Sequence, residues 1–187
     1  MDLRTWILDD LHSLRARLDG AVLDVVPHDR RGDRVGGGIS TTYVLWHLAR
    51  HHDLAVNRVL RDRDELVEAW TPRLGVSHDL WRGLAEAEDV DLVAQLDHEA
   101  VDGYVLAVLD GTAAWLADAA LSRLDRPVHA EPALHALGVP RDRFDWLYAM
   151  WEGRPAAFFV SWEAIGHGVS HLGELIATRN RMGLSPF

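Results

Sequence analysis

The sequence predicts an all-α fold, a four-helix bundle with a long connection between its second and third helices. Apolar residues recur every three to four positions in four long segments, which is the spacing of amphipathic helices. Polar stretches rich in glycine and proline separate these segments, and no stretch alternates as a half-buried β-strand does. The 187 residues can bury a substantial core, so we expect a single domain over residues 1–187.

The first helix is expected over residues 3–17, where the apolar positions lie on one face. Asp19 and Gly20 favour a turn, so we expect the helix to end there. The polar stretch at 27–38 contains three consecutive glycines but lacks the flanking residues of a phosphate-binding loop. We therefore interpret this stretch as a flexible linker.

The second helix is expected to begin after Ser40, whose hydroxyl suits the N-cap position, and to run to Leu60. The charged residues at 61–66 are expected to form its solvated end. Residues 66–97 give no clear period and contain Pro72 and Gly75, which indicates a long loop with a short helix. A loop of that length is unusual, and a crossover or a cover over a site would explain it.

The remaining helices are expected at 97–121, at 141–152 and from Pro155 to about Met182. Proline suits the first turn of a helix, because its missing N–H has no partner there in any case. Glycine tolerates the left-handed conformation that often ends a helix, so Gly183 is expected to stop the last one.

Composition excludes several classes of function. The formal net charge is −10, and we find no strongly basic patch in the sequence, so nucleic-acid binding is not expected. The chain has no cysteine, which removes disulfides and thiolate metal ligands. Aspartates interrupt the apolar positions near the N-terminus, and no apolar run approaches the roughly 18 residues of a membrane span. We expect a cytoplasmic protein with no membrane partner.

Histidines on the inner faces of two helices suggest a metal site. His167 and His171 lie four residues apart, so their rings project from neighbouring turns of one helix and can converge on one ion. His47, on the apolar face of the second helix, is the best third ligand. His51, one turn further along, is a rival, and His52 points elsewhere. The alternative is that these rings are buried, neutral and hydrogen-bonded within the core.

Residues around the histidine pair fit such a site. Glu163 and Glu174 are spaced to accept an N–H from an imidazole, which would fix the tautomer of a metal ligand. The pair lacks the internal glutamate of the HExxH motif, so a metalloprotease is not expected. Three glycines flank the pair and would either leave room around a ligand or allow close helix packing: Gly166, Gly168 and Gly173.

The two segments YVLWHLARHHDLAVNRVL and HGVSHLGEL resemble the DinB/YfiT-like superfamily of metalloenzymes. The last helix of that family commonly reads His-x-x-x-His followed by Arg-Gly-Gln. His167 and His171 match the pair and Gly173 matches the glycine, whereas Leu172 and Glu174 stand where the family has arginine and glutamine. The specific motifs occupy only these two segments, although the resemblance in helix arrangement spans most of the chain.

The resemblance implies a four-helix bundle that holds one divalent metal ion (zinc, nickel or iron) on three histidines, with His47 as the ligand from the second helix. Similar proteins include the mycothiol-dependent maleylpyruvate isomerase and bacillithiol transferases. The first hypothesis is therefore a metal-dependent thiol S-transferase or isomerase that uses mycothiol and a small-molecule substrate. The second is a non-catalytic metal-binding or stress-response module with a structural metal site.

The remaining expectations concern the substrate and the assembly. Arg50 or Arg179 could bind an anionic group of the substrate. Apolar residues left on the outer helix faces indicate a homodimer. Five aromatic residues could wall the cavity: Tyr43, Trp46, Tyr104, Trp115 and Trp162.

Overall fold

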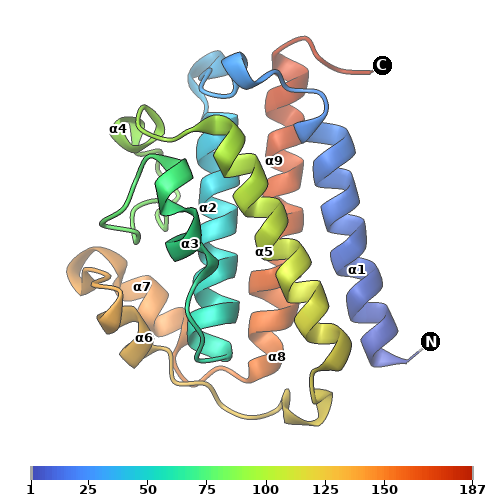
Figure 1. Cartoon of the computed structure of the whole chain (residues 1–187), viewed down its shortest axis with the longest axis vertical. Helices are drawn as coiled ribbons and strands as arrows, with labels where there is room; N and C mark the ends of the chain where they lie inside the picture. Colours follow the sequence, from blue (N-terminus) through green and yellow to red (C-terminus); the bar gives the residue numbers. More distant parts are fainter. Residues whose placement is uncertain (1, 187) are drawn as a thin grey trace.

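The computed structural model describes residues 2–186, which form an all-helical protein (Figure 1). Within that range there is no β-strand, only an isolated bridge between Pro127 and Pro155. The α-helices are α1 (Leu3–Leu18), α2 (Thr41–Asp53), α3 (Leu66–Leu74), α4 (Val90–Val93), α5 (His98–Asp118), α6 (Glu131–Ala136), α7 (Arg141–Trp151), α8 (Ala156–Phe158) and α9 (His167–Arg181). Three π-helical segments extend or precede them: η1 (Asp19–Leu23), η4 (Leu54–Leu60) and η6 (Phe159–Gly166). The short 3₁₀ turns are η2 (His28–Arg30), η3 (Val35–Gly37) and η5 (Leu121–Arg123).

Four long helical segments lie side by side in Figure 1: α1, α2 with η4, α5, and η6 with α9. Helix α5 packs against α1 and α2, and α9 packs against the same two helices from the other side. Their apolar faces form one continuous core that includes Leu14, Trp46, Tyr104 and Leu172. The shorter helices α3, α6 and α7 lie outside this group, with α3 against α5.

The first helix does not end at Asp19 and Gly20. It continues as η1 to Leu23, because side chains from other segments donate hydrogen bonds to its last carbonyl groups. Arg179 donates to the carbonyl of Ala21, and the buried guanidinium of Arg31 donates to those of Leu23 and Val26. Arg31 also pairs with Asp102, so the glycine-rich stretch expected as a linker is anchored to the core by a buried side chain.

The expectation for the second helix is confirmed at both ends. The Ser40 hydroxyl accepts a hydrogen bond from the backbone N–H of Tyr43 and caps α2. The helix then continues beyond Asp53 as the π-helical η4 and reaches Leu60. Every residue of α2 is buried, since α5, α9 and the loop at 75–89 surround it.

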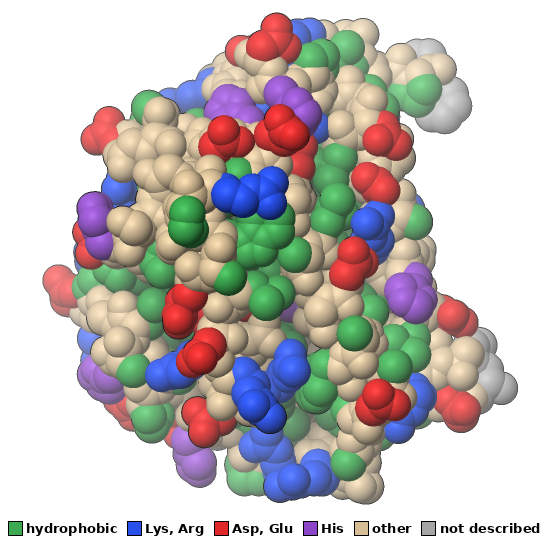
Figure 2. All heavy atoms as spheres, viewed as in Figure 1, with side chains coloured by type: hydrophobic (Ala, Val, Ile, Leu, Met, Phe, Trp, Pro, Cys, Tyr) green, Lys and Arg blue, Asp and Glu red, His purple; other side chains and the backbone are tan. Residues whose placement is uncertain are grey.

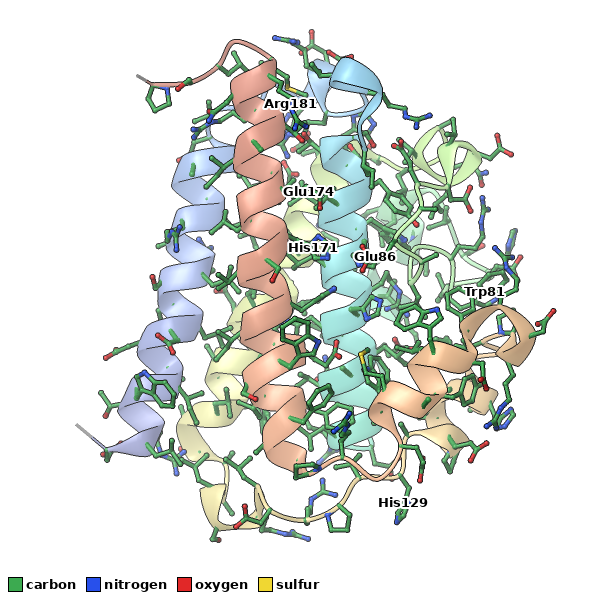
Figure 3. The ribbon with its side chains drawn as sticks, turned by 180° about the vertical axis from the view of Figure 1, so that it is seen from behind. Trp81, Glu86, His129, His171, Glu174 and Arg181 are labelled. Carbon is green, nitrogen blue, oxygen red and sulfur yellow. The ribbon has the colours of Figure 1, made fainter. Side chains whose placement is uncertain are left out.

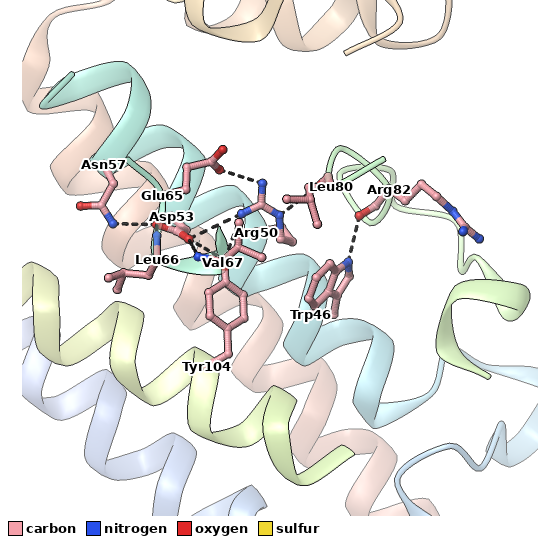
Figure 4. Close-up of polar contacts among 10 residues, drawn as sticks. All are labelled: Trp46, Arg50, Asp53, Asn57, Glu65, Leu66, Val67, Leu80, Arg82 and Tyr104. Carbon is pink, nitrogen blue, oxygen red and sulfur yellow. Dashed lines mark hydrogen bonds and ion pairs between the residues drawn. The ribbon is translucent and has the colours of Figure 1, made fainter. Parts of the chain in front are cut away.

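The charged stretch at 61–66 is only partly solvated, because Glu65 is buried in a polar network beside α2 (Figure 4). Arg50, fully buried, donates to Glu65 at 2.7 Å and to the hydroxyl of Tyr104 at 3.0 Å. Asp53 accepts hydrogen bonds from the backbone N–H groups of Leu66 and Val67, which are the first residues of α3. The network therefore caps α3 from α2 and fixes the two helices together.

Residues 66–97 contain two helices, α3 and α4, joined by a loop at 75–89 that lies against α2. The indole N–H of Trp46 donates to the carbonyl of Arg82, and the hydroxyl of Tyr43 donates to the carbonyls of Ala85 and Ala87. This loop is the cover that the unusual length of the connection suggested.

Helix α5 is long and apolar enough to cross a membrane by length and composition alone. Half of its most apolar window is buried inside the protein, and the helix packs against α1, α2 and α3. The core helix of a globular protein can be equally long and apolar. The contacts of α5 with α1, α2 and α3 bury its apolar faces and explain them without a membrane.

The sequence predicted no basic patch, but the fold gathers arginines from two distant segments at one end of the helices. Arg61 and Arg63 follow η4, and Arg123 and Arg126 follow α5; all four line a pocket of about 520 Å³. Figure 2 shows the blue side chains that collect at the lower end of the molecule. Trp115, expected near the metal site, lines this pocket instead, with Arg61 stacked on its ring.

The last helical segment is continuous from Ala156 to Arg181 through α8, η6 and α9. Pro155 precedes its first residue as the N-cap rather than lying in the first turn. The segment ends as expected, with Gly183 in the left-handed conformation at φ +77°.

Candidate metal centre

Four histidine rings meet in the core between α2 and α9. His47 and His51 come from α2, and His167 and His171 come from the start of α9. Their ring centroids lie 4.5–5.1 Å apart in five of the six pairings. All four residues are at most 8% exposed, so the protein brings together polar rings that need partners within the core.

Three of these histidines form one group with a carboxylate. A ligand atom from each of His47, His167, His171 and Glu86 lies within 4.8 Å of the others. The Nε2 atoms of His167 and His171 are 3.0 Å apart. Two nitrogens bound tetrahedrally to one zinc ion at about 2.05 Å would be about 3.3 Å apart, so the pair needs little adjustment to share an ion.

Hydrogen bonds fix two of these rings in the tautomer that a metal ligand requires. The Nδ1–H of His47 donates to the carbonyl of Gly83 at 2.7 Å, and the Nδ1–H of His171 donates to Glu174 at 3.0 Å. Each ring therefore keeps the lone pair of Nε2 available. The Nε2 atom of His47 is buried and has no hydrogen-bond partner in the described structure, as expected of a nitrogen whose lone pair binds a metal ion.

Burial keeps two histidines of this group, His47 and His167, neutral. Desolvation lowers the pKa of His47 well below its ordinary value, and the neighbouring rings of His51, His171 and His167 lower it further. Desolvation likewise lowers the pKa of His167 to about 2. Neutral imidazole is the form that binds metal, so both rings are ready to act as ligands near neutral pH without losing a proton.

The loop at 75–89 holds the rings of α2 through main-chain groups. Gly83 supplies the carbonyl for His47, and Leu84 supplies one for the Nε2–H of His51 at 2.9 Å. Gly83 has φ +95°, and a Cβ there would lie 2.2 Å from the ring of Trp46. Only glycine fits this position. These contacts could not be predicted from the sequence, because a main-chain carbonyl that contacts a distant helix does not depend on the type of its residue.

The outer side of the group is lined by two acidic residues. Glu86 lies 3.9 Å from the Nε2 atom of His47, and its side chain is 75% exposed. Figure 3 shows His171 and Glu174 on α9 and Glu86 on the loop beside α2. A cavity of about 10 Å³ lies among His47, Glu86, His171 and Glu174. That is room for about one water molecule or ion.

His51 forms a second group with other partners. It lies with Glu163 and His167, one ligand atom from each within 4.8 Å of the others. Glu163 accepts a hydrogen bond from the indole of Trp151 at 2.7 Å, and its second oxygen lies 3.6 Å from the Nδ1 atom of His51. His47 thus shares a group with both histidines of α9, whereas His51 shares one with His167 alone. His52 points away and contacts Thr112, as expected.

Several predicted substrate contacts are wrong. Arg50 is held in the network of Figure 4, and Arg179 bonds to Ala21 and Asn180, so neither faces the histidines. The rings of Trp46 and Tyr104 pack against each other in the core, and their polar atoms bond to Arg82 and Asp53. Of the five aromatic residues expected at the site, the rings of two lie beside its histidines, Tyr43 next to His47 and Trp162 next to His167.

The glycines beside the histidine pair do not make room for a metal. A Cβ on Gly168 would lie 2.5 Å from a methyl group of Leu14 in α1, and one on Gly166 would contact Trp162. A Cβ on Gly173 would meet nothing within 4 Å. Gly168 therefore allows the close packing of α1 on α9, which was the second of the two interpretations of these glycines.

Comparisons with known proteins bear on the fold. No family model and no curated protein matches the chain. A conserved protein of Enterococcus faecalis, known from its crystal structure, is similar over 98% of this chain and 99% of its own length, with a TM-score of 0.67. The two sequences are 18% identical. The chain therefore has a fold that is found in a bacterial protein of nearly equal extent.

Proposed function

We propose that this chain is a metal-binding protein of the DinB/YfiT-like type, a four-helix bundle in which His47, His167 and His171 hold one divalent metal ion. The observation that supports this most strongly is the buried Nε2 atom of His47, which has no partner and lies among the ligand atoms of the other two rings. Nitrogen ligands of this number suit zinc, nickel or iron. A core of hydrogen-bonded neutral histidines would leave no such atom unpaired.

The proposed activity is a thiol S-transferase or isomerase reaction with mycothiol and a small-molecule substrate. A divalent cation would supply Lewis-acid chemistry, which lowers the pKa of a coordinated thiol. Glu174 holds the Nδ1 proton of His171, and the carbonyl of Gly83 holds that of His47, so both rings keep their orientation during the reaction. Glu86, whose side chain is 75% exposed and lies 3.9 Å from the Nε2 atom of His47, would have to turn outward to admit a thiol.

A second candidate is a non-catalytic module with a structural metal site. The small cavity favours it, because about 10 Å³ beside the histidines has no room for a substrate unless the loop moves. In this case Glu86 is the fourth ligand and closes the site.

The substitution Glu86→Ala separates the two candidates. For the enzyme, the variant keeps its metal and still joins the sulfur of mycothiol to an electrophile such as chlorodinitrobenzene, with release of chloride and a proton. For the structural site, the variant loses most of its metal affinity, and neither form transfers a thiol. Metal content and product formation are measured on the same samples, with the exposed Glu68→Ala as the control.

A further inference from the structure

We propose that His51, Glu163 and His167 form a second cation site, directly beside the first and sharing His167 with it. This inference rests on the proposed metal centre, since one ring serves both positions. The second site extends that centre from one ion to two.

The three residues offer ligand atoms that have no other use. The Nδ1 atoms of His51 and His167 and one carboxylate oxygen of Glu163 (Oε2) are buried and lack a hydrogen-bond partner in the described residues. His51 is 2% exposed, His167 is 7% exposed and Glu163 is 1% exposed. A buried polar atom without a partner costs about 1–3 kcal/mol, and three such atoms in one place are rare in a folded protein. One cation bound by all three removes this cost.

The other polar atoms of His51 and Glu163 already form hydrogen bonds. These bonds fix the orientation of the two side chains. The Nε2–H of His51 donates to the carbonyl of Leu84, so the lone pair of its Nδ1 atom is free. The Oε1 atom of Glu163 accepts the indole N–H of Trp151, which leaves Oε2 free. Metal ligands in proteins are oriented in the same way, by hydrogen bonds to the atoms that do not bind the metal.

His167 can serve both sites because its two nitrogens lie on different edges of the ring. Its Nε2 atom lies 3.0 Å from that of His171 in the first group, whereas its Nδ1 atom has no partner. The neutral ring carries one N–H proton and binds the first ion in that form, so binding of the second ion releases this proton to solvent and leaves His167 as a bridging imidazolate. The unpaired state of Nδ1 is the observation that distinguishes this ring from His47 and His171, whose Nδ1 atoms donate to oxygen.

Charge also favours a cation. The carboxylate of Glu163 is buried, and its one ion-pair partner among the described residues is His51, at 3.6 Å. No arginine reaches it, and the chain has no lysine. Two imidazole nitrogens and one carboxylate oxygen form a set that zinc, nickel and iron all accept. The alternative is a direct ion pair between His51 and Glu163 without any metal.

The number of ions bound per chain tests the proposal. Chelator-treated protein is dialysed against buffered zinc and analysed by mass spectrometry, and a parallel titration with cobalt(II) follows the visible absorption of each site. We expect two equivalents in the unchanged chain and one in Glu163→Gln, which keeps the acceptor for Trp151. His51→Gln gives a second test, and circular dichroism establishes that each variant is folded. Glu68→Gln, exposed on α3, is the matched control and keeps two.

Each other outcome has a definite meaning. One equivalent in both the unchanged chain and Glu163→Gln overturns the second site and favours the His51–Glu163 ion pair, while the proposed metal centre stands. Two equivalents in both chains mean that the second ion binds elsewhere. No bound zinc or cobalt in the unchanged chain overturns the metal centre itself.

Discussion

At the scale of single residues, the orientation of His47 depends on a loop more than 30 positions away. The carbonyl of Gly83 fixes the ring, and Gly83 occupies its place only because it has no Cβ. The affinity of a protein site for its metal falls about 10–100-fold when the group that hydrogen-bonds a histidine ligand is removed. The identity of the loop residue is therefore as important as that of the ligand.

Gly83→Ala tests this dependence. The added Cβ clashes with Trp46 and is strained at φ +95°, so the loop shifts and His47 loses its acceptor. We expect zinc affinity to fall about 10–100-fold, as measured by competition with a chromogenic chelator. Gly36→Ala is the control, since Gly36 also has positive φ (+63°) but has no atom near its Cβ position. Equal affinity losses in the two variants would contradict the role assigned to the Gly83 carbonyl.

The buried histidines also predict how stability depends on pH. In metal-free protein the pKa values of His47 and His167 lie below the unfolded value of about 6.5. Below that pH the unfolded chain binds protons that the folded chain does not, so folding free energy is lost as pH falls. We expect the urea midpoint of the metal-free protein to decrease between about pH 6.5 and 4.

The matched variant is His167→Asn, in which one of these groups is gone. Its urea midpoint should change less over the same pH range than that of the unchanged metal-free chain. If the urea midpoint changed equally with pH in both proteins, the acid sensitivity would have another origin. One such origin is the buried His52, because burial lowers the pKa of this residue to about 4.

At the scale of elements, α9 is shaped by contacts on both of its sides. One side carries His167 and His171 toward α2, and the other packs Gly168 against Leu14 of α1. A glycine inside a helix costs about 1 kcal/mol relative to alanine. For Gly168 the close approach of α1 offsets that cost, but for Gly173 no neighbour explains it.

Alanine substitutions at these two glycines should have opposite effects. Gly168→Ala forces the methyl group against Leu14 and should destabilise the protein by about 1–3 kcal/mol. Gly173→Ala meets nothing within 4 Å and should stabilise it by about 0.5–1 kcal/mol. Urea unfolding of both variants measures the difference. A stable Gly168→Ala protein would show that α1 is free to move away.

The sequence predicted the elements better than their ends. Ser40 and the apolar period located α2 because a cap and a stripe are local signals. The continuation of the first helix as η1 could not be predicted, since its carbonyl groups depend on Arg31 and Arg179, which approach from other segments. The burial of Glu65 was missed for the same reason, because its partner Arg50 lies on another helix.

The candidate metal site likewise has a part that local spacing predicts and a part that depends on tertiary contacts. The spacing of His167 and His171 and the inner face of α2 were enough to place three rings together, because helix geometry is regular. Glu86, Gly83 and Leu84 come from an irregular loop whose path is set by tertiary contacts. The anion-binding roles expected for Arg50 and Arg179 were wrong, because a residue type does not reveal which backbone groups it will meet.

At the scale of the whole molecule, the metal centre joins two helices that are distant in the chain. His47 lies on α2, and the other two ligands lie on α9, so a bound ion crosslinks the folded state and has no equivalent in the unfolded chain. Stability and metal concentration should therefore be linked.

Thermal unfolding with and without zinc measures this linkage. Free zinc at about 100 times its dissociation constant should stabilise the fold by about 2.7 kcal/mol, or about 5–10 °C for a chain of this size. His171→Ala should show a smaller shift, because it removes a ligand of the first site. A zinc-dependent shift of the same size in this variant would place the stabilising ion elsewhere.

The expected homodimer also belongs to this scale and stays a prediction. Leu3 and Trp6 are about half exposed beside an apolar groove of about 480 Å³ between α1 and the start of the last helical segment. Sedimentation equilibrium at several concentrations gives the mass of the assembly directly. A single mass near 21.0 kDa at all concentrations would contradict the dimer.

The most direct test of the metal centre is the metal content of the purified protein and of its histidine variants. We predict that His47→Ala and His171→Ala each bind one equivalent of zinc less than the unchanged chain. His167→Ala should bind none, and His12→Ala, which alters an exposed histidine of α1, should bind as much as the unchanged chain. Undiminished zinc in His47→Ala and His171→Ala would contradict the three-histidine site.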